Sequence, residues 1–184
     1  MTNGFNTRKK FALLIITFLV AIPLGVYLYI QNIWIVEPLT LGSKIPSVIV
    51  STFNGEIVKT DSLFAKKTVI LFFSTTCPHC KNKITDLNSL YKEFEDKFGM
   101  VAFSLDGEKE TKEFINELKI LFPVYLDNIS DAKLQFRVKF VPATFFINQQ
   151  QLLKSQIGEQ SKELLYNQLL KFASITNDSL FTLL

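Results

Sequence analysis

Two cysteines separated by two residues constrain this chain more than any other feature. Cys77 and Cys80 flank Pro78 and His79, so four consecutive positions hold every cysteine and the single histidine of 184 residues. Two thiols at this spacing can close a disulfide only where the backbone coils, as in the first turn of a helix, whose free N–H groups also stabilise a thiolate. The motif predicts a redox-active pair, with Cys77 as the reactive thiol and Cys80 as the thiol that resolves a mixed disulfide.

A structural disulfide or a metal site could use the same two thiols. A disulfide that closes a four-residue loop removes little entropy from the unfolded chain, so it would stabilise the fold little. Structural zinc needs four ligands, whereas the motif offers two thiols and one imidazole within one turn. We therefore expect no resident metal and no cofactor. Copper(I) on the Cys77 and Cys80 thiolates stays open as an alternative, which would make the protein a metallochaperone.

An uncharged stretch of twenty residues runs from Phe11 to Ile30, directly after Arg8, Lys9 and Lys10. A helix of that length covers about 30 Å, the thickness of the hydrocarbon core of a membrane. Positive charge before the stretch predicts that the N-terminus stays in the cytoplasm and the remainder is exported. A cleaved signal peptide is the alternative, but its apolar region usually has about 7 to 15 residues and ends at a small-x-small site.

The expected organisation follows from this stretch. Residues 1–10 form a cytoplasmic basic flank, and residues 11–35 form an uncleaved signal anchor that crosses the cell membrane once. Residues 36–175 form one extracytoplasmic domain, and residues 176–184 form a tail without an informative pattern. The three basic residues of the flank account for the whole net charge of +3, which leaves 17 basic and 17 acidic residues. The balanced body of the chain excludes a nucleic-acid-binding face.

Strands and helices alternate around the motif. Residues 68–73 form a continuous apolar run, typical of a strand buried on both faces. Apolar residues then recur at steps of three and four, and we expect Gly99 to end that helix. A strand over 100–105 and a helix over 110–121 repeat the unit, so the strands should be parallel in one sheet with helices on both faces. The second helix is expected to bury Phe114, Leu118 and Leu121.

Shorter elements complete the predicted domain. Upstream, Asn54-Gly55 lies between strands over 48–50 and 56–58 and indicates a hairpin. Downstream, the pattern predicts a strand over 123–126, a short helix over 131–136, and antiparallel strands over 144–148 and 151–157. A last helix over 161–172 begins with Ser161 as its N-cap. It is expected to bury Leu164, Leu165, Leu169 and Phe172.

From about residue 41 to residue 172 the chain resembles the membrane-anchored thioredoxin-fold proteins of the TlpA/ResA type. The matching features, in order, are Gly42-Ser43-Lys44-Ile45-Pro46, the apolar strand into Cys77-x-x-Cys80, Phe122-Pro123-Val124 with Asp127, Phe140-Val141-Pro142-Ala143-Thr144, and Gly158. The resemblance implies an α/β thioredoxin fold with a central mixed sheet, helices on both faces and an N-terminal hairpin, preceded by one transmembrane helix. It also implies a cis peptide before Pro142, facing the dithiol. The backbone of Val141 would then pair with an extended substrate segment, and we place Thr76 with it as a substrate-binding residue.

The tetrapeptide Cys-Pro-His-Cys resembles the active site of DsbA-type dithiol oxidases. An imidazole beside a helix N-terminus can donate to the Cys77 thiolate, which stabilises the reduced form and makes the disulfide more oxidising. His79 and Pro78 are therefore expected to tune the reduction potential.

Three residues depart from the patterns of these families. Leu71 stands where thioredoxin itself has a buried aspartate, and Thr76 stands where a tryptophan usually precedes the first cysteine. Lys83 stands where ResA-like reductases carry a glutamate, and its charge would favour a thiolate. No acid near the motif in sequence is an obvious proton acceptor for Cys80, which leaves a distant segment or water.

These features predict an exported, membrane-tethered thiol–disulfide oxidoreductase that acts on cysteine-containing proteins. The anchor and the domain favour a reductase of targets such as apocytochrome c or a copper-site protein, recharged by a membrane thiol electron carrier. The tetrapeptide favours a dithiol oxidase instead. A peroxidase on the same fold would resemble P-x-x-x-T-x-x-C, and the chain has Ile70 and Ser74 in place of the proline and the threonine.

Overall fold

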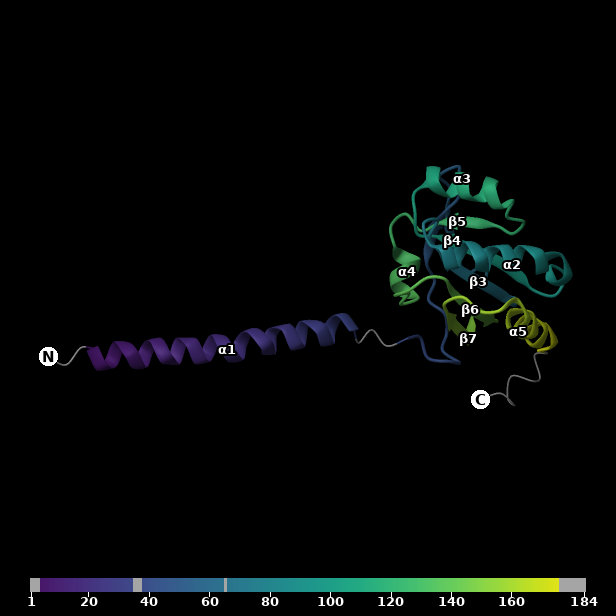
Figure 1. Cartoon of the computed structure of the whole chain (residues 1–184). Helices are drawn as coiled ribbons and strands as arrows, with labels where there is room; N and C mark the ends of the chain where they lie inside the picture. Colours follow the sequence, from purple (N-terminus) through teal and green to yellow (C-terminus); the bar gives the residue numbers. More distant parts are fainter. Residues whose placement is uncertain (1–3, 35–37, 65, 176–184) are drawn as a thin grey trace. The chain divides into compact units, whose positions relative to one another are not determined.

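The computed structural model describes residues 4–34, 38–64 and 66–175. The chain divides into two compact units between Glu37 and Pro38 (Figure 1). The predicted tail, residues 176–184, lies outside the described residues, as does the last residue of the predicted anchor.

The first unit is one helix, α1 (Gly4–Trp34), with Pro23 inside it. Its segment Lys10–Tyr29 has a mean hydropathy of 2.6, and none of that segment is buried within the described residues. By length and composition this helix is a candidate membrane span, as the sequence predicts. A signal sequence near an N-terminus would have the same properties.

A seven-stranded mixed sheet forms the second unit, in the order β2-β1-β5-β4-β3-β6-β7. Strands β3, β4 and β5 are parallel, whereas β1, β2, β6 and β7 join through antiparallel pairs. The predicted mixed sheet is thereby confirmed. The strands are β1 (Ile49–Ser51), β2 (Ile57–Lys59), β3 (Thr68–Phe73), β4 (Gly99–Ser104), β5 (Val124–Leu126), β6 (Ala143–Asn148) and β7 (Gln151–Ile157).

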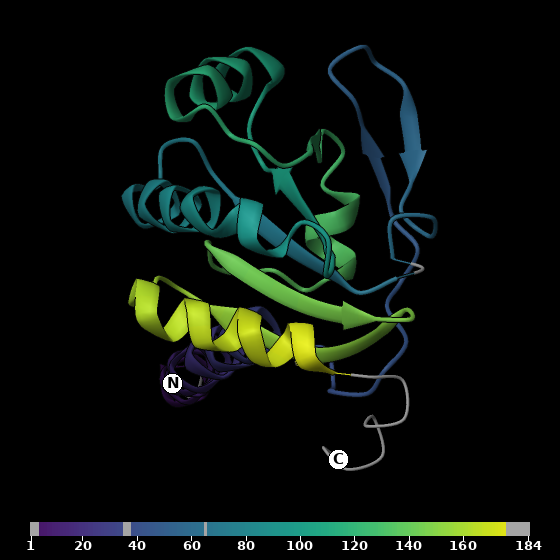
Figure 2. The same ribbon diagram turned by 90° about the vertical axis from the view of Figure 1, so that its right-hand side faces the viewer.

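Helices cover both faces of this sheet (Figure 2). They are α2 (Pro78–Phe94), α3 (Glu108–Leu118), α4 (Asp131–Gln135) and α5 (Lys162–Ser174). Helices α2 and α5 lie side by side along one face, and α4 lies behind the sheet in that view. Ser161 caps α5 as predicted, because its hydroxyl accepts the N–H of Leu164.

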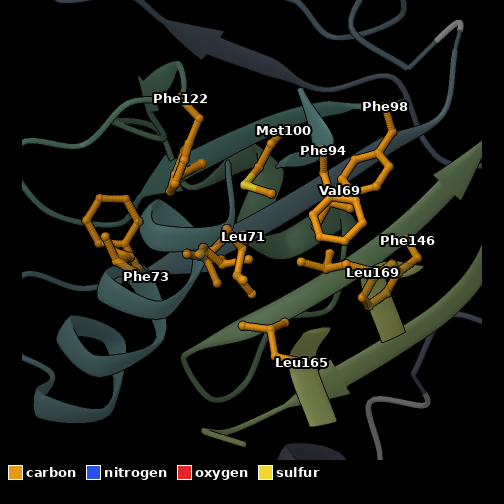
Figure 3. Packing of buried hydrophobic residues seen from close by; sticks show 14 of the residues in the cluster. Val69, Leu71, Phe73, Phe94, Phe98, Met100, Phe122, Phe146, Leu165 and Leu169 are labelled. Atoms are coloured by element: carbon orange, nitrogen blue, oxygen red, sulfur yellow. The ribbon is translucent and has the colours of Figure 1, made fainter. Parts of the chain in front are cut away.

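The central strand β3 divides the hydrophobic core into two clusters. Every residue of β3 is buried, and alternate side chains point to opposite faces. Leu71 and Phe73 pack with residues of α2, α3 and α5, and Figure 3 shows this cluster around the strand. Phe72 belongs to the other cluster, which includes Ala132 of α4. Burial on both faces explains why the sequence of β3 has no polar alternation.

Three details differ from the sequence-based expectations. Helix α2 ends at Phe94, not near Gly99, and Gly99 begins β4. Phe98 keeps the apolar spacing because it stacks on Phe94 at a ring distance of 5.5 Å, but it does so from the turn after the helix. Leu121 is 50% exposed because Lys119, in the left-handed region at φ 49°, ends α3 before it. Leu164 is 48% exposed, since it lies one position outside the face that buries Leu165 and Leu169.

The predicted hairpin forms with its strands shifted by one residue. Ile49 pairs with Lys59 and Ser51 with Ile57, so the five connecting residues are 52–56 instead of 51–55. The Thr52 hydroxyl accepts the N–H groups of Asn54 and Glu56 within this loop. Gly55 has φ +79°, a left-handed conformation that glycine adopts without strain.

Candidate active site

The dithiol occupies the start of helix α2, where β3 ends. Cys77 is the N-cap, with extended backbone angles of φ −90° and ψ 113°, and Pro78 follows in the first turn. The backbone N–H of Cys80 donates to the Cys77 sulfur at 3.3 Å. Both cysteines are free thiols, and their burial differs: Cys77 is half-buried, whereas Cys80 is fully buried. An incoming disulfide can therefore reach Cys77 first.

The segment 141–142 faces the dithiol across a distance of 64 residues in sequence. The Val141–Pro142 peptide bond is cis, as the resemblance implies. The Cys77 thiol donates to the Val141 carbonyl oxygen, with 3.7 Å between sulfur and oxygen. The Pro142 carbonyl accepts the N–H of Gly158 at 2.7 Å. Val141 and Pro142 thus lie beside Cys77, where the sequence placed them.

Burial controls the protonation of Cys80. The pKa of its thiol is raised above the ordinary value, first by burial and then by the hydrogen bond from Cys77 and by the negative charges of Cys77 and Asp106. The backbone of Ser74 acts in the opposite direction. Cys80 is therefore a protonated thiol in the resting dithiol.

The His79 imidazole makes its hydrogen bond away from the dithiol. Its Nδ1 lies 2.6 Å from Oε2 of Glu159, and its side chain is 70% exposed. Asn82 donates to the other carboxylate oxygen of Glu159 at 2.9 Å. These two hydrogen bonds, with that from His79 first, lower the pKa of Glu159. Among the described residues, the hydrogen bonds of this ring lead to Glu159 and not to the Cys77 sulfur, so the predicted direct contact is absent.

Lys83 is buried one turn beyond Cys80. Its ammonium nitrogen donates to the side-chain oxygen of Gln160 at 2.8 Å, and its side chain is fully buried. Burial lowers its pKa from 10.5 to about 8, against a smaller raising effect from Asp86 and Glu159. Lys83 faces the loop before α5. The expected effect of its charge on the thiols is not among the influences on Cys80.

The dithiol thus borders a shallow hollow that segments from three parts of the chain line together. His79 comes from α2, Val141 and Pro142 precede β6, and residues 158–161 connect β7 to α5. Thr76 is exposed beside Cys77, and its hydroxyl lies 3.1 Å from the hydroxyl of Ser74. A half-buried sulfur at a helix N-terminus, next to open backbone, suits attack on an extended disulfide-containing segment.

Comparison with known protein families identifies this arrangement. The model of the AhpC/TSA family matches residues 41–156, which include the dithiol and the cis-proline segment. The chain belongs to the AhpC/TSA family. This AhpC/TSA domain is also 27% identical to the thiol-disulfide oxidoreductase ResA of Bacillus thuringiensis (strain Al Hakam) over 139 residues, 73% of this chain and 80% of ResA.

Two further relatives extend the likeness. Sporulation thiol-disulfide oxidoreductase A of Bacillus subtilis (strain 168) is 25% identical over 126 residues, 65% of this chain and 76% of its own. The crystal structure of a putative thiol:disulfide interchange protein DsbE from Chlorobium tepidum superposes with a TM-score of 0.68 at 23% identity, and covers 74% of this chain and 99% of its own. The predicted thioredoxin fold and the predicted ResA-like relationship are thereby confirmed. With its free dithiol, this AhpC/TSA family member is a thiol–disulfide oxidoreductase.

Three side chains of the AhpC/TSA family member reach the site although the sequence analysis did not select them. Asp106 follows β4, and Glu159 and Gln160 follow β7. A signal existed for Asp106, because carboxyl ends of adjacent parallel strands meet at one edge of a sheet, and an acid there lies close to the motif that follows β3. For Glu159 and Gln160 the only signal was their position before the last helix.

Proposed function

We propose that this thiol–disulfide oxidoreductase is tethered to the cell membrane by α1 and reduces disulfides in exported proteins. The carrying observation is the asymmetry of the dithiol, with Cys77 half-buried at the helix N-terminus and Cys80 fully buried behind it. Only a thiol that a protein substrate can reach can start the exchange, and only a thiol within the same turn can finish it. In this reading Cys77 attacks and Cys80 resolves.

The exchange runs in two balanced steps. The Cys77 thiolate attacks one sulfur of the substrate disulfide, a Cys77–substrate bond forms, and the other substrate sulfur leaves as a thiolate that takes up a proton. Cys80 then loses its proton to solvent and attacks the Cys77 sulfur, which releases the second substrate sulfur. The substrate gains two electrons and the enzyme becomes a Cys77–Cys80 disulfide. A membrane thiol electron carrier would return the enzyme to its dithiol form.

The hollow beside Cys77 is the proposed binding site for the substrate segment. The Val141 carbonyl oxygen lies 3.7 Å from the Cys77 sulfur, which supports this proposal. An extended segment that brings its disulfide to Cys77 would pass Val141 and Pro142 and could pair with their backbone, and Thr76 would border it on the other side. Apocytochrome c and copper-site proteins are the substrates we expect, since both require reduced cysteines outside the cytoplasm.

The contacts of His79 support the reductase direction in this proposal. An oxidase of the DsbA type would need the imidazole to stabilise the Cys77 thiolate. Here the imidazole hydrogen-bonds Glu159, and its charge when protonated is balanced by that carboxylate. The main physical reason to expect an oxidase from this tetrapeptide, a contact of His79 with the Cys77 thiolate, is therefore missing. This favours the reductase.

Redox titration against glutathione tests this direction. We expect a reduction potential more negative than about −230 mV, at the reducing end of the glutaredoxin range. A potential near the DsbA value of about −120 mV would overturn the reductase and support the dithiol oxidase. Glu159→Gln provides the matched variant: if Glu159 restrains His79, its removal shifts the potential in the oxidising direction.

A trapping experiment in cells tests the roles of the two cysteines. Cys80→Ala should accumulate mixed disulfides through Cys77, which mass spectrometry of the captured proteins would identify. Cys77→Ala is the control and should capture nothing. Three results together would support a copper(I) metallochaperone instead of an enzyme: Cys80→Ala captures no protein, and the wild-type chain retains one copper(I) ion and does not reduce insulin. Consumption of hydrogen peroxide by the reduced chain would instead indicate a peroxidase.

A further inference from the structure

The Asp106 carboxylate holds the segment that leads into the dithiol. Its Oδ2 accepts the backbone N–H of Thr75 at 2.5 Å, and its Oδ1 accepts the Ser74 hydroxyl at 3.2 Å. The carbonyl of Ser74 in turn accepts the N–H of Cys77 at 3.2 Å. One side chain thereby connects the loop after β4 to the backbone that positions the reactive cysteine.

The sheet brings this carboxylate to the site. Strands β3 and β4 are parallel, and their last residues, Phe73 and Ser104, are paired in register. The next residue, Leu105, donates its N–H to the Phe73 carbonyl at 3.0 Å. Asp106 is itself held in place, because its N–H donates to the Ser104 hydroxyl at 3.3 Å. Asp106 therefore lies at a defined position and not on a free loop.

The charge of this carboxylate is not balanced by an ion pair within the described residues. Its two hydrogen-bond donors, Ser74 and Thr75, are neutral, so they orient the charge without cancelling it. The charged side chains that follow in sequence at the start of α3 are Glu108, Lys109 and Glu110, and none of them forms an ion pair with Asp106 among the salt bridges of the described residues.

Cys80 is the group on which this charge acts. Two titratable groups bear on its thiol: Cys77 from the same turn and Asp106 from the loop after β4. Burial opposes its ionisation most, and these two groups act in the same direction. Lys83, the nearest buried cation along α2, donates to Gln160 instead.

We propose that Asp106 is a positioning residue for the resolving step: it holds Ser74 and Thr75 in the segment before the dithiol, and its fixed negative charge opposes deprotonation of Cys80. The inference deepens the proposed function and depends on it. In the resolving step Cys80 gives its proton to solvent, forms the bond to Cys77, and the substrate sulfur leaves with the electron pair of the broken bond. A fixed negative charge near the dithiol adds to the effect of burial and opposes the first event, so it lengthens the life of the mixed disulfide and raises the pH at which the substrate is released.

The test uses the full chain in detergent and an aromatic disulfide, 5,5′-dithiobis(2-nitrobenzoic acid). Cys77 releases the first thionitrobenzoate and Cys80 releases the second, so stopped-flow absorbance separates the two steps. Asp106→Asn keeps an acceptor for Thr75 and removes the charge. We expect its second step to be severalfold faster below neutral pH, with the pH profile displaced downward.

Two variants separate charge from shape. Asp106→Glu keeps the charge and should retain the wild-type pH profile. Glu113→Gln, on the exposed side of α3, removes one negative charge at a site without contact to residues 74–76 and should also leave the profile unchanged. A purely structural role would slow the second step of Asp106→Asn at every pH without moving the profile, and this result would overturn the inference.

Another measurement follows the ionisation of Cys80 without the resolving step. In a Cys77→Ser chain, the rate of iodoacetamide reaction with Cys80 against pH reports its ionisation directly. Asp106→Asn should shift this profile downward, and coincident profiles would also overturn the inference. Failure of the proposed function looks different: the wild-type chain itself would then release no second thionitrobenzoate.

Discussion

At the scale of single residues, Lys83 is the most unusual member of the site. A lysine is rarely buried without a carboxylate partner, because burial disfavours its charged form. Here the amine has the neutral side chain of Gln160 as its hydrogen-bond acceptor. Its pKa of about 8 lies below the ordinary 10.5, so the folded protein holds this proton more weakly than the unfolded chain does. Lys83 therefore reduces the stability of the fold at neutral pH.

Lys83→Met should remove this pH dependence. Between pH 8 and 10.5 the unfolded chain binds more protons at this site than the folded chain, so the wild-type free energy of unfolding rises with pH relative to the variant. The difference between 10.5 and about 8, at 1.36 kcal/mol per unit, amounts to about 3 kcal/mol. Urea unfolding of both proteins from pH 7 to 10.5 measures it. Lys92→Met, at an exposed position, keeps Lys83, so its free energy of unfolding should change with pH in parallel with that of the wild type. Parallel curves for Lys83→Met and wild type would contradict the burial argument.

At the scale of elements, strand β3 supports the site because both its faces are packed. Phe72 is fully buried and contacts Phe103 and Phe145 edge-on, at ring distances of 5.2 and 5.6 Å. Phe73, on the opposite face, stacks on Phe114 of α3 at 5.6 Å. The end of β3 is consequently held from both sides, directly before the segment that leads to Cys77.

Phe72→Ala should destabilise the domain by about 3–5 kcal/mol, because it removes a buried ring and leaves a cavity between aromatic neighbours. Chemical denaturation followed by circular dichroism gives the value. Leu121→Ala, at a half-exposed side chain, is the matched control and should change the free energy of unfolding by about 0.5 kcal/mol or less. A loss for Phe72→Ala no larger than for this control would mean that the cluster repacks around the cavity.

Local patterns were sufficient for most elements and failed at their ends. The bounds of β3 and β7 agree with the sequence, because an apolar run and an antiparallel partner leave little choice. The end of α2 was misplaced, since Phe98 keeps the helical spacing although the backbone has already turned. Apolar spacing reports which side chains face the core, whereas backbone hydrogen bonds decide where a helix stops.

At the scale of the whole molecule, the chain consists of an apolar helix and a redox domain. The proposed function requires the domain to lie outside the cytoplasm, where disulfides persist in proteins. The three basic residues before the apolar stretch favour that orientation. The proposed location of the domain outside the cytoplasm therefore depends on the basic residues and the apolar stretch of the first unit, whereas the redox chemistry depends on the second unit.

A membrane-impermeant maleimide tests this orientation in intact cells. Cys77 of the reduced wild-type chain should react, because its sulfur is accessible and, in the proposed topology, faces outward. In a chain without native cysteines, Asn6→Cys should react only after the cells are permeabilised. If Asn6→Cys were labelled in intact cells and Cys77 were not, the topology would be opposite to the proposed one. If the chain were found shortened and released from the membrane, the apolar stretch would be a cleaved signal peptide and not an anchor.

The sequence by itself determined the chemistry and the class of fold: two thiols at one helical turn, an apolar strand before them, and a proline segment whose resemblance to known families placed it opposite the dithiol. Only the tertiary structure decided what surrounds the thiols. The register of β3 and β4 brings Asp106 to Ser74 and Thr75, directly before the first thiol, and Glu159 hydrogen-bonds His79 from 80 positions away in sequence. Those contacts depend on how strands pair and where loops cross, and a local pattern carries no information about which distant side chain arrives there. The sequence thus identified the redox pair, whereas the pairing of the strands determined which charged side chains lie close to it.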